Sequence, residues 1–191
     1  MRIRKLWRPD GGVRVNIGSG HDYRAGWINV DRYAKRADLR FDLLKFPWDL
    51  EDDSVDWLYA NQIVEHVPPR LGDEDGLIRV LREVHRILKA GGRMYIGVPM
   101  AGTVSDYANI THYRHFVKSS FDFLPGGPAK TSNLAPQAAL RFRLLARKTH
   151  RKIRIAGLDT SYHFPKYLRF DPNIGVRYGL VFILEKIPGP D

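Results

Sequence analysis

The 191-residue sequence contains no cysteine, which excludes disulfides, thiolate metal sites and cysteine nucleophiles. It also has no apolar run approaching the roughly 20 residues that cross a bilayer, so we expect no membrane span. The basic first nine residues are not followed by the apolar segment of a signal peptide. Together these absences favour a cytoplasmic protein, and the length fits a single domain spanning residues 1–191.

Acidic residues are scarce in the later part of the chain. Lysine and arginine outnumber aspartate and glutamate by 31 to 21, for a formal net charge of +10. Residues 1–109 hold 17 basic and 16 acidic side chains, whereas residues 110–191 hold 14 and 5. The basic residues are densest over 141–154. Such a stretch either attracts a polyanion such as a nucleic acid or forms a solvated face, and the sequence leaves both interpretations open.

The first part of the chain alternates between strand and helix signals. Five short apolar runs predict strands, at residues 13–17, 27–31, 39–44, 54–60 and 93–98. Between the last two, apolar residues recur at three- and four-residue spacing and predict a helix over 77–88. Acidic residues at 73–75 suit its start, and Gly91-Gly92 suit its end. Strand, helix and strand with short links form a parallel crossover unit.

The pattern weakens after the fifth predicted strand. Residues 118–124 predict a short helix, and residues 140–148 fit either a strand or a basic helix. Residues 125–136 are typical of a loop rich in glycine, proline and serine, and residues 151–177 of an insertion rich in aromatic and basic side chains. Residues 178–187 predict a final strand.

Glycine or polar residues stand at or near the ends of the first four predicted strands, namely Gly18-Ser19-Gly20, Asp31, Asp42 and Asn61-Gln62. In open α/β sheets, ligands bind outside the carboxyl ends of the strands, so these positions converge on one crevice. Glycine there lets a ligand approach the backbone closely. An acidic residue at the end of the second strand is placed to accept hydrogen bonds from ribose hydroxyls.

These residues, in this order, resemble the class I S-adenosylmethionine-dependent methyltransferases. More narrowly, the chain is similar to the small type 11 methyltransferases, especially those found near surface-polysaccharide and glycosyltransferase genes. The matching stretches are VNIGSG (15–20), GWINVD (26–31), DL…FPW…DDSVD (42–56), EH (65–66) and LREVHRILKAGGR (81–93).

The resemblance covers roughly residues 13–124. It implies a single Rossmann-like α/β domain with a mostly parallel seven-stranded sheet and an antiparallel last strand. It also implies methyl transfer from S-adenosylmethionine. Residues 13–124 would form the cofactor-binding core, and residues 125–191 would add a substrate-side loop, the insertion and the last strands.

By position, the resemblance assigns cofactor binding to Asn16, Gly18, Gly20, Asp31, Asp42, Leu43, Asn61 and Gln62. Asp31 would hold the ribose hydroxyls and Asp42 the adenine amino group. Asn61 and Gln62 would flank the methionine end near the sulfonium. Asn16 stands where the family often has an acidic residue, which weakens one contact to the methionine amine.

The first crossover departs from the usual pattern. Only residues 21–26 separate Gly20 from Trp27, although a parallel crossover normally needs a dozen or more residues. We therefore expect a first helix shortened to about one turn, or coverage of that face by residues 1–12. The narrower subgroup shares this shortening.

Glu65, His66, His112 and His115 are candidate bases, and the first three are assigned to catalysis. A general base helps when the methyl acceptor is a hydroxyl. The Glu65-His66 pair occurs in the family across many substrates, which favours a structural role for it. His112 and His115 have a spacing that suggests a metal, but no third ligand stands at metal-site spacing, so we expect no metal.

The sequence thus predicts methyl transfer from S-adenosylmethionine to a hydroxyl or similar acceptor of a small molecule or saccharide. The basic later half supports an alternative, an RNA methyltransferase. A third hypothesis is a non-catalytic nucleic-acid-binding or scaffold protein that retains the fold, motivated by Asn16 and the shortened first helix. The oligomeric state is left open.

Overall fold

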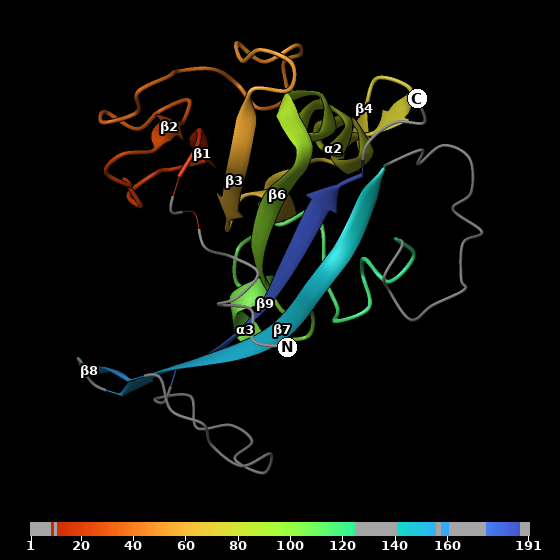
Figure 1. Ribbon diagram of the computed structural model, residues 1–191. Coiled ribbons are helices and arrows are strands. Elements are labelled where there is room, and N and C mark those ends of the chain that lie inside the picture. Colours follow the sequence, from red (N-terminus) through yellow and green to blue (C-terminus); the bar gives the residue numbers. More distant parts are fainter. Residues whose placement is uncertain (1–8, 10, 125–140, 156–157, 161–174, 188–191) are drawn as a thin grey trace.

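The computed structural model describes residues 9, 11–124, 141–155, 158–160 and 175–187, with the backbone alone for 150–155, 158–160 and 175–178 (Figure 1). In chain order, the elements are β1 (Arg14–Ile17), β2 (Ile28–Val30), β3 (Val55–Asn61), the 3-10 helix η1 (Val64–His66), β4 (Arg70–Leu71), β5 (Glu74–Asp75), α2 (Gly76–Ile87), β6 (Leu88–Pro99), α3 (Val104–Tyr107), β7 (Phe142–Ile155), β8 (Leu158–Thr160) and β9 (Gly175–Lys186).

One twisted sheet organises the chain, with strand order β2-β1-β3-β6-β9-β7-β8. The strands β2, β1, β3 and β6 are mutually parallel. The last strand, β9, lies between β6 and β7 and is antiparallel to both. The predicted α/β architecture, a mostly parallel sheet with an antiparallel last strand, is confirmed.

The strands are not all the predicted ones. The strand expected over 39–44 is reduced to a single parallel bridge between Val30 and Leu39. The chain turns soon afterwards, because the Asp42 carboxylate accepts a hydrogen bond from the backbone N–H of Leu44 at 3.0 Å. At the other edge, β8 pairs antiparallel with β7, and this strand was not predicted. In Figure 1, β8 and the far end of β7 extend away from the rest of the sheet.

Of the two expectations for the first crossover, the one-turn helix is not found over residues 18–27, and the other, coverage by residues 1–12, falls mostly outside the described residues. Residues 18–27 form turns and irregular backbone that lead from β1 directly into β2. Side-chain hydrogen bonds hold this short crossover in place of a helix. The buried Asn16 amide donates to the Asp22 carbonyl at 2.7 Å and to Asn29 Oδ1 at 3.1 Å. The Arg24 guanidinium then lies 3.6 Å from the centroid of the Tyr59 ring and covers part of the face a helix would cover.

Helix α2 forms where the apolar spacing predicts it. The Asp75 carboxylate caps its first turn by accepting hydrogen bonds from the N–H groups of Leu77 and Ile78 at 2.9 and 3.1 Å. The apolar face is buried against one face of the sheet, through Leu77, Val80, Leu81, Val84 and Ile87 (Figure 1). Burial of this face fixes α2 over the central strands.

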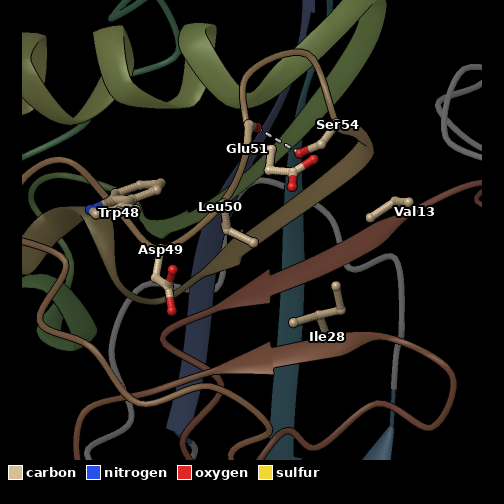
Figure 2. Close-up of a pocket in the computed structure, with 7 residues that line it drawn as sticks. All are labelled: Val13, Ile28, Trp48, Asp49, Leu50, Glu51 and Ser54. Carbon is tan, nitrogen blue, oxygen red and sulfur yellow. Dashed lines mark hydrogen bonds between the residues drawn. The ribbon is translucent and has the colours of Figure 1, made fainter.

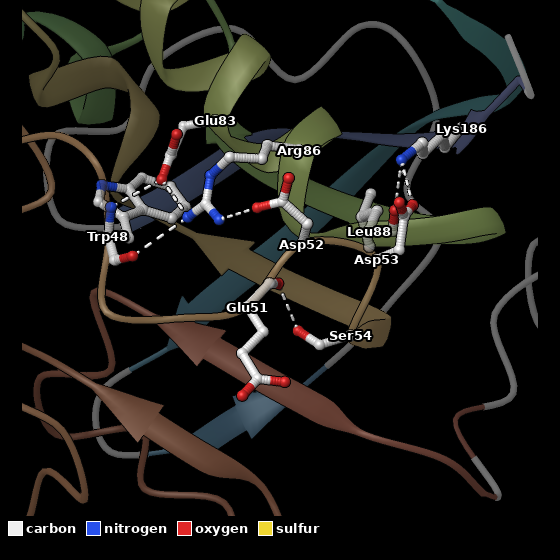
Figure 3. Close-up of polar contacts among 9 residues, drawn as sticks. All are labelled: Trp48, Glu51, Asp52, Asp53, Ser54, Glu83, Arg86, Leu88 and Lys186. Carbon is white, nitrogen blue, oxygen red and sulfur yellow. Dashed lines mark hydrogen bonds and ion pairs between the residues drawn. The ribbon is translucent and has the colours of Figure 1, made fainter.

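A polar network ties the loop before β3 to α2 and to the last strand (Figure 3). Glu83 Oε1 accepts hydrogen bonds from the Trp48 N–H at 2.7 Å and from the Arg86 guanidinium at 2.6 Å. Arg86 also donates to the Trp48 carbonyl at 3.1 Å. On β9, the buried Lys186 ammonium donates to the Leu88 carbonyl at 2.7 Å. The network joins segments far apart in the sequence.

The predictions for the later chain have mixed outcomes. Residues 118–124 form successive turns with hydrogen bonds three residues apart, so the predicted helix is wrong. Residues 142–148 belong to β7, which decides between the strand and helix alternatives. The predicted final strand is confirmed as β9. The 125–136 loop and residues 161–174 of the insertion lie outside the described residues. Among the described helices, none has the length and apolarity to span a membrane.

Candidate functional site

The glycine loop, residues 18–20, follows the carboxyl end of β1 and is hydrogen-bonded to the carboxyl end of β2. The Ser19 N–H donates to the Val30 carbonyl at 3.0 Å, and the Gly20 N–H donates to Asp31 Oδ2 at 2.8 Å. Gly18 and Gly20 have φ values of 62° and 47°, a region that L side chains rarely adopt. The loop thus brings Gly18, Gly20 and Asp31 to one edge of the sheet, as the sequence predicts.

The two glycines are required for different reasons. A Cβ on Gly18 would lie 2.5 Å from Ile63 Cγ1, so close packing inside the protein excludes a side chain there. A Cβ on Gly20 would have the Gly18 carbonyl oxygen, 4.0 Å away, as its nearest neighbour among the described residues. The space over Gly20 is therefore open, and a ligand can approach this backbone as it cannot approach Gly18.

The Asp31 carboxylate organises this corner. Besides the bond from Gly20, its Oδ1 accepts hydrogen bonds from the N–H groups of Tyr33 and Ala34 at 2.7 and 2.8 Å. Burial raises its pKa, but these three backbone donors and the charge of His21 outweigh burial, and the pKa of Asp31 lies below its usual value. A carboxylate offers about four acceptor positions, so one remains beyond the three backbone bonds.

Asp42 and Leu43 lie in the turn that follows the Val30–Leu39 bridge. Asp42 Oδ2 pairs with the Arg32 guanidinium at 2.7 Å, and the Leu43 carbonyl accepts a hydrogen bond from the Trp48 indole at 3.1 Å. Arg32 directly follows Asp31, so this ion pair links the two predicted cofactor carboxylates. Asp42 would share its charge between Arg32 and any bound ligand.

Asn61 ends β3 and Gln62 follows it, and both contact Gly97 of β6, a residue that the sequence analysis did not single out. A Cβ on Gly97 would lie 2.3 Å from Asn61 Oδ1, so only glycine leaves room for the Asn61 side chain over β6. Gln62 has a φ of 58°, and its N–H donates to the Gly97 carbonyl at 2.7 Å. The glycine inside the 93–98 strand pattern was the available signal, because such glycines mark close approach.

Glu65, on η1, is fully buried at 0% exposure. Neither of its carboxylate oxygens has a hydrogen-bond partner among the described residues. Burial raises the pKa of Glu65 to about 7. The backbone N–H of Glu65 lowers this pKa, and the nearby Asp106 carboxylate raises it further. A buried carboxyl group without a partner is costly for the fold, and such groups are concentrated at functional sites.

His66 and His112 meet next to this carboxylate. Their ring centroids are 4.8 Å apart, and ligand atoms of Glu65, His66 and His112 all lie within 4.8 Å of one another. His66 Nδ1 contacts the Thr111 carbonyl oxygen at 3.1 Å, and His112 Nδ1 contacts the Asp106 carbonyl oxygen at 2.8 Å. Burial lowers the pKa of His66, the Thr111 contact raises it, and the charge of His112 lowers it, with a net decrease.

The structure thus brings together all three predicted catalytic residues. These three residues are also potential metal ligands, a set that the spacing of His112 and His115 did not reveal. His115 is not in the cluster; its Nδ1 contacts Asp106 Oδ2 at 2.9 Å. The expectation of no metal considered ligand spacing along the sequence, whereas Glu65 and His66 come near His112 because η1 lies beside the 109–115 loop.

Arg114 fixes the 109–115 loop onto η1. The N–H groups of Tyr113 and Arg114 donate to the Glu65 carbonyl at 2.9 and 3.2 Å. The Arg114 guanidinium donates to the Val67 carbonyl at 2.9 Å and to both oxygens of Asp75 at 3.0 Å. Because Asp75 also caps α2, the helix start, η1 and the histidine loop form one rigid unit.

The sequence around the glycine loop and the Glu65-His66 pair matches a known protein family. Residues 19–96 match the family model of a methyltransferase domain, type 11. This segment begins in the glycine loop and ends in β6, so it contains Gly20, Asp31, Asn61 and the Glu65-His66 pair. Over residues 19–96, the chain therefore matches a class I, type 11-like S-adenosylmethionine-dependent methyltransferase domain. No curated protein sequence matches this methyltransferase.

Solved structures similar to the methyltransferase share its fold at low sequence identity. A candidate methyltransferase from Bacillus halodurans is 12% identical, with a TM-score of 0.61 over 97% of each chain. An S-adenosylmethionine-dependent methyltransferase from Archaeoglobus fulgidus is 16% identical, with a TM-score of 0.60 over 96% of this chain and 90% of that one. One from Methanosarcina mazei is 14% identical, with a TM-score of 0.57 over 98% of each chain. These likenesses establish the fold.

The methyltransferase also has a pocket of about 450 Å³ away from the glycine loop (Figure 2). Its lining residues are Val13, Ile28, Trp48, Asp49, Leu50, Glu51 and Ser54. Val13 precedes β1 and Ile28 begins β2, so the pocket lies at the amino ends of these strands. Ligands of open α/β sheets bind at the opposite, carboxyl ends. The glycine loop and the Glu65 cluster, rather than this pocket, therefore form the candidate functional site.

Proposed function

We propose that this methyltransferase methylates a hydroxyl or similar acceptor of a small molecule or saccharide, at the carboxyl ends of β1, β2, β3 and β6. The observation that carries the proposal is the cluster of Glu65, His66 and His112, which follows Asn61 and Gln62 along the chain. The cluster offers proton-accepting groups at the edge where the cofactor's methionine end is expected. A hydroxyl acceptor must lose its proton during transfer, which such groups assist.

In this proposal the cofactor is held by Asn16, Gly18, Gly20, Asp31, Asp42, Leu43, Asn61 and Gln62. Two observations support the fit of S-adenosylmethionine: the open space over Gly20 and the remaining acceptor position on Asp31. Asn16 is buried and bonded within the crossover, so its part is to hold residues 22–29 against the glycine loop.

When bound, S-adenosylmethionine supplies an electrophilic methyl group that needs little further activation. The protein's part is to orient the acceptor and exclude water, and positioning of this kind is worth up to roughly 7–11 kcal/mol of the barrier. His112 is oriented by its Nδ1 contact with the Asp106 carbonyl, which leaves Nε2 to accept the acceptor's proton. His66 is oriented in the same way by Thr111.

The alternative acceptor is RNA, and the basic residues of 141–154 motivate it. Two of their side chains are already paired within the protein, Arg143 with Glu185 and Arg147 with Asp122. Paired arginines are less able to bind phosphate, so this observation favours the small-molecule or saccharide acceptor over RNA. Residues 125–191 would then contribute the substrate side of a single domain with the 13–124 core.

Titration calorimetry with S-adenosylhomocysteine tests the cofactor site. We expect micromolar binding by the full chain and at least a tenfold loss of affinity in Asp31→Ala. Unchanged affinity in that variant contradicts the assignment of Asp31.

Transfer of a labelled methyl group tests the acceptor. A fractionated pool of hydroxylated small molecules and saccharides should be labelled, and total RNA should not. RNA labelling, with an affinity that falls steeply as salt rises, would establish the alternative instead. In His112→Asn, turnover should fall while S-adenosylhomocysteine affinity is retained. His85→Asn is the control, since His85 packs on Phe142 from α2, outside the cluster.

A further inference from the structure

In the Glu65 cluster, three groups that can accept a hydrogen bond or bind a cation lie close together. The Glu65 carboxylate is fully buried and unpartnered among the described residues, and the two histidines present ring nitrogens to the same space. One shared proton could form a hydrogen bond between two of these groups, and the third would still have no partner. A cation placed between them satisfies all three at once.

The hydrogen bonds fix which nitrogen each histidine offers. A backbone carbonyl can only accept, so the Nδ1 of His66 donates to the Thr111 carbonyl and the Nδ1 of His112 donates to the Asp106 carbonyl. The Thr111 hydroxyl also lies 2.9 Å from His66 Nδ1, but it donates its own proton to Asn109 Oδ1 at 2.8 Å and so accepts from the imidazole. In the neutral rings, Nε2 then carries the lone pair, and no described residue bonds to it. Metal-ligating histidines characteristically donate their other N–H to a backbone carbonyl or a carboxylate.

The local charge is also unbalanced. Glu65 and Asp106 are both buried, at 0% and 1% exposure, and Asp106 Oδ1 likewise lacks a partner in the described part of the chain. Within the same part, no lysine or arginine pairs with either carboxylate; the only ion pair joins Asp106 to His115. Two buried carboxylates with so little compensation favour an additional positive charge.

We propose that Glu65, His66 and His112 bind one divalent transition-metal ion of the zinc type. Two imidazoles and one carboxylate are a ligand set that such ions accept, and three protein ligands leave a coordination position for another molecule. Because η1 and the 109–115 loop are locked together by Arg114, the three ligands are held in place before the ion arrives.

The role of the ion rests on the function proposed above. At the open position it would bind the acceptor's oxygen and lower the pKa of the hydroxyl, so that the proton is released to water and the methyl acceptor is an alkoxide-like oxygen. With the ion bound, His66 and His112 would act as ligands, and the ion would take over the role of the histidine base proposed above. The acceptor class this favours has a hydroxyl next to a second oxygen able to approach the same ion, as in vicinal diols of saccharides.

Binding of Co²⁺ to the metal-free full-length protein tests the site without any turnover. Co²⁺ is the probe because its visible absorption reports coordination by nitrogen and oxygen ligands. We expect one equivalent to bind with a new visible band, and Zn²⁺ to displace it. Loss of a second-shell partner typically costs 10–100-fold in metal affinity, so the ligand variants Glu65→Gln and His112→Asn should each lose about 100-fold or more.

The matched control is His115→Asn, which changes a neighbouring histidine outside the cluster and should leave the Co²⁺ band and affinity unchanged. Thermal unfolding of each variant verifies that it is folded, and Glu65→Gln is expected to fold because it removes a buried charge. Absence of Co²⁺ binding, or equal binding by the ligand variants and wild type, overturns the proposal. So does a loss in His115→Asn as large as in His112→Asn.

Calorimetry with S-adenosylhomocysteine on the same samples separates this inference from the proposed function. Cofactor binding without Co²⁺ binding refutes the metal site alone. Co²⁺ binding lost in the ligand variants, but without cofactor binding, upholds the metal site and refutes the assigned cofactor site.

Discussion

The open space over Gly20 yields a prediction that separates ligand binding from folding. Gly20 has a φ of 47°, so Gly20→Ala places an alanine in the left-handed region at a cost of about 1–2 kcal/mol. Its Cβ meets no described atom closer than 4.0 Å, so we expect no packing penalty in addition. For a chain of this length, the melting temperature should fall by about 2–8 °C.

Gly91→Ala is the matched control for this strain. Gly91 has a φ of 73°, and a Cβ there meets nothing within 4 Å, but it lies at the start of β6, at the opposite end of the sheet from the glycine loop. The two variants should therefore lose similar stability. Only Gly20→Ala should lose affinity for S-adenosylhomocysteine, by at least tenfold in titration calorimetry, because its methyl group occupies the space assigned to the cofactor.

Gly18→Ala completes the series. Its Cβ collides with Ile63, so overpacking of about 1–3 kcal/mol adds to the backbone strain, and its melting temperature should fall below that of Gly20→Ala. The reasoning is refuted if Gly20→Ala binds S-adenosylhomocysteine as tightly as Gly91→Ala does, or if Gly20→Ala is the less stable of the two glycine-loop variants.

Three further predictions concern groups around the site and the core. Folding lowers the pKa of Asp31 below its ordinary value of 3.8. The ionised carboxylate therefore stabilises the fold above pH 3.8, and this stabilisation is lost as the pH falls through the pKa of the folded state. The melting temperature of Asp31→Asn should be lower than that of wild type by a constant amount near pH 7, and the difference should shrink below pH 3.8. Lys186→Met keeps the apolar stem but removes the ammonium that donates to the Leu88 carbonyl and pairs with Asp53, which should cost about 1–3 kcal/mol in urea unfolding. Asp53→Asn removes the charge of the partner alone and is the control; an unchanged midpoint in Lys186→Met would refute a stabilising role for these contacts. Arg114→Lys keeps the charge but cannot contact the Val67 carbonyl and Asp75 together, as Arg114 does through Nε and Nη2; the histidine loop should loosen, and turnover should fall by about 10- to 100-fold at unchanged S-adenosylhomocysteine affinity.

The sequence predicts what local chemistry determines. The helix α2 follows from its apolar spacing and from Asp75, whose side chain caps it regardless of the rest of the fold. The positions after the strands could be predicted because parallel strands end at the same edge of a sheet. Gly18, Gly20 and Asp31 therefore lie together as expected, with Asp31 bonded to the glycine loop.

What the sequence did not reveal depends on contacts between distant segments. The bridge at Leu39 replaced a strand because the Asp42 carboxylate turns the backbone, and an apolar pattern does not register that competition. Residues 18–27 form no helix, and hydrogen bonds from the Asn16 amide to Asp22 and Asn29 hold this crossover instead. The Glu65 cluster arises from the docking of the 109–115 loop on η1, which leaves no periodic signal.

The position of β9 has a consequence for how this protein is made. β9 pairs with β6 on one side and β7 on the other, although it is the last of these three strands in the sequence. During synthesis, β6 and β7 must wait with unpaired edges until residues near 186 leave the ribosome, at about 5–20 residues per second. The apolar residues Leu180–Leu184 complete the core only then. Any ribosome pause before β9 therefore prolongs the interval in which open strand edges can recruit other chains.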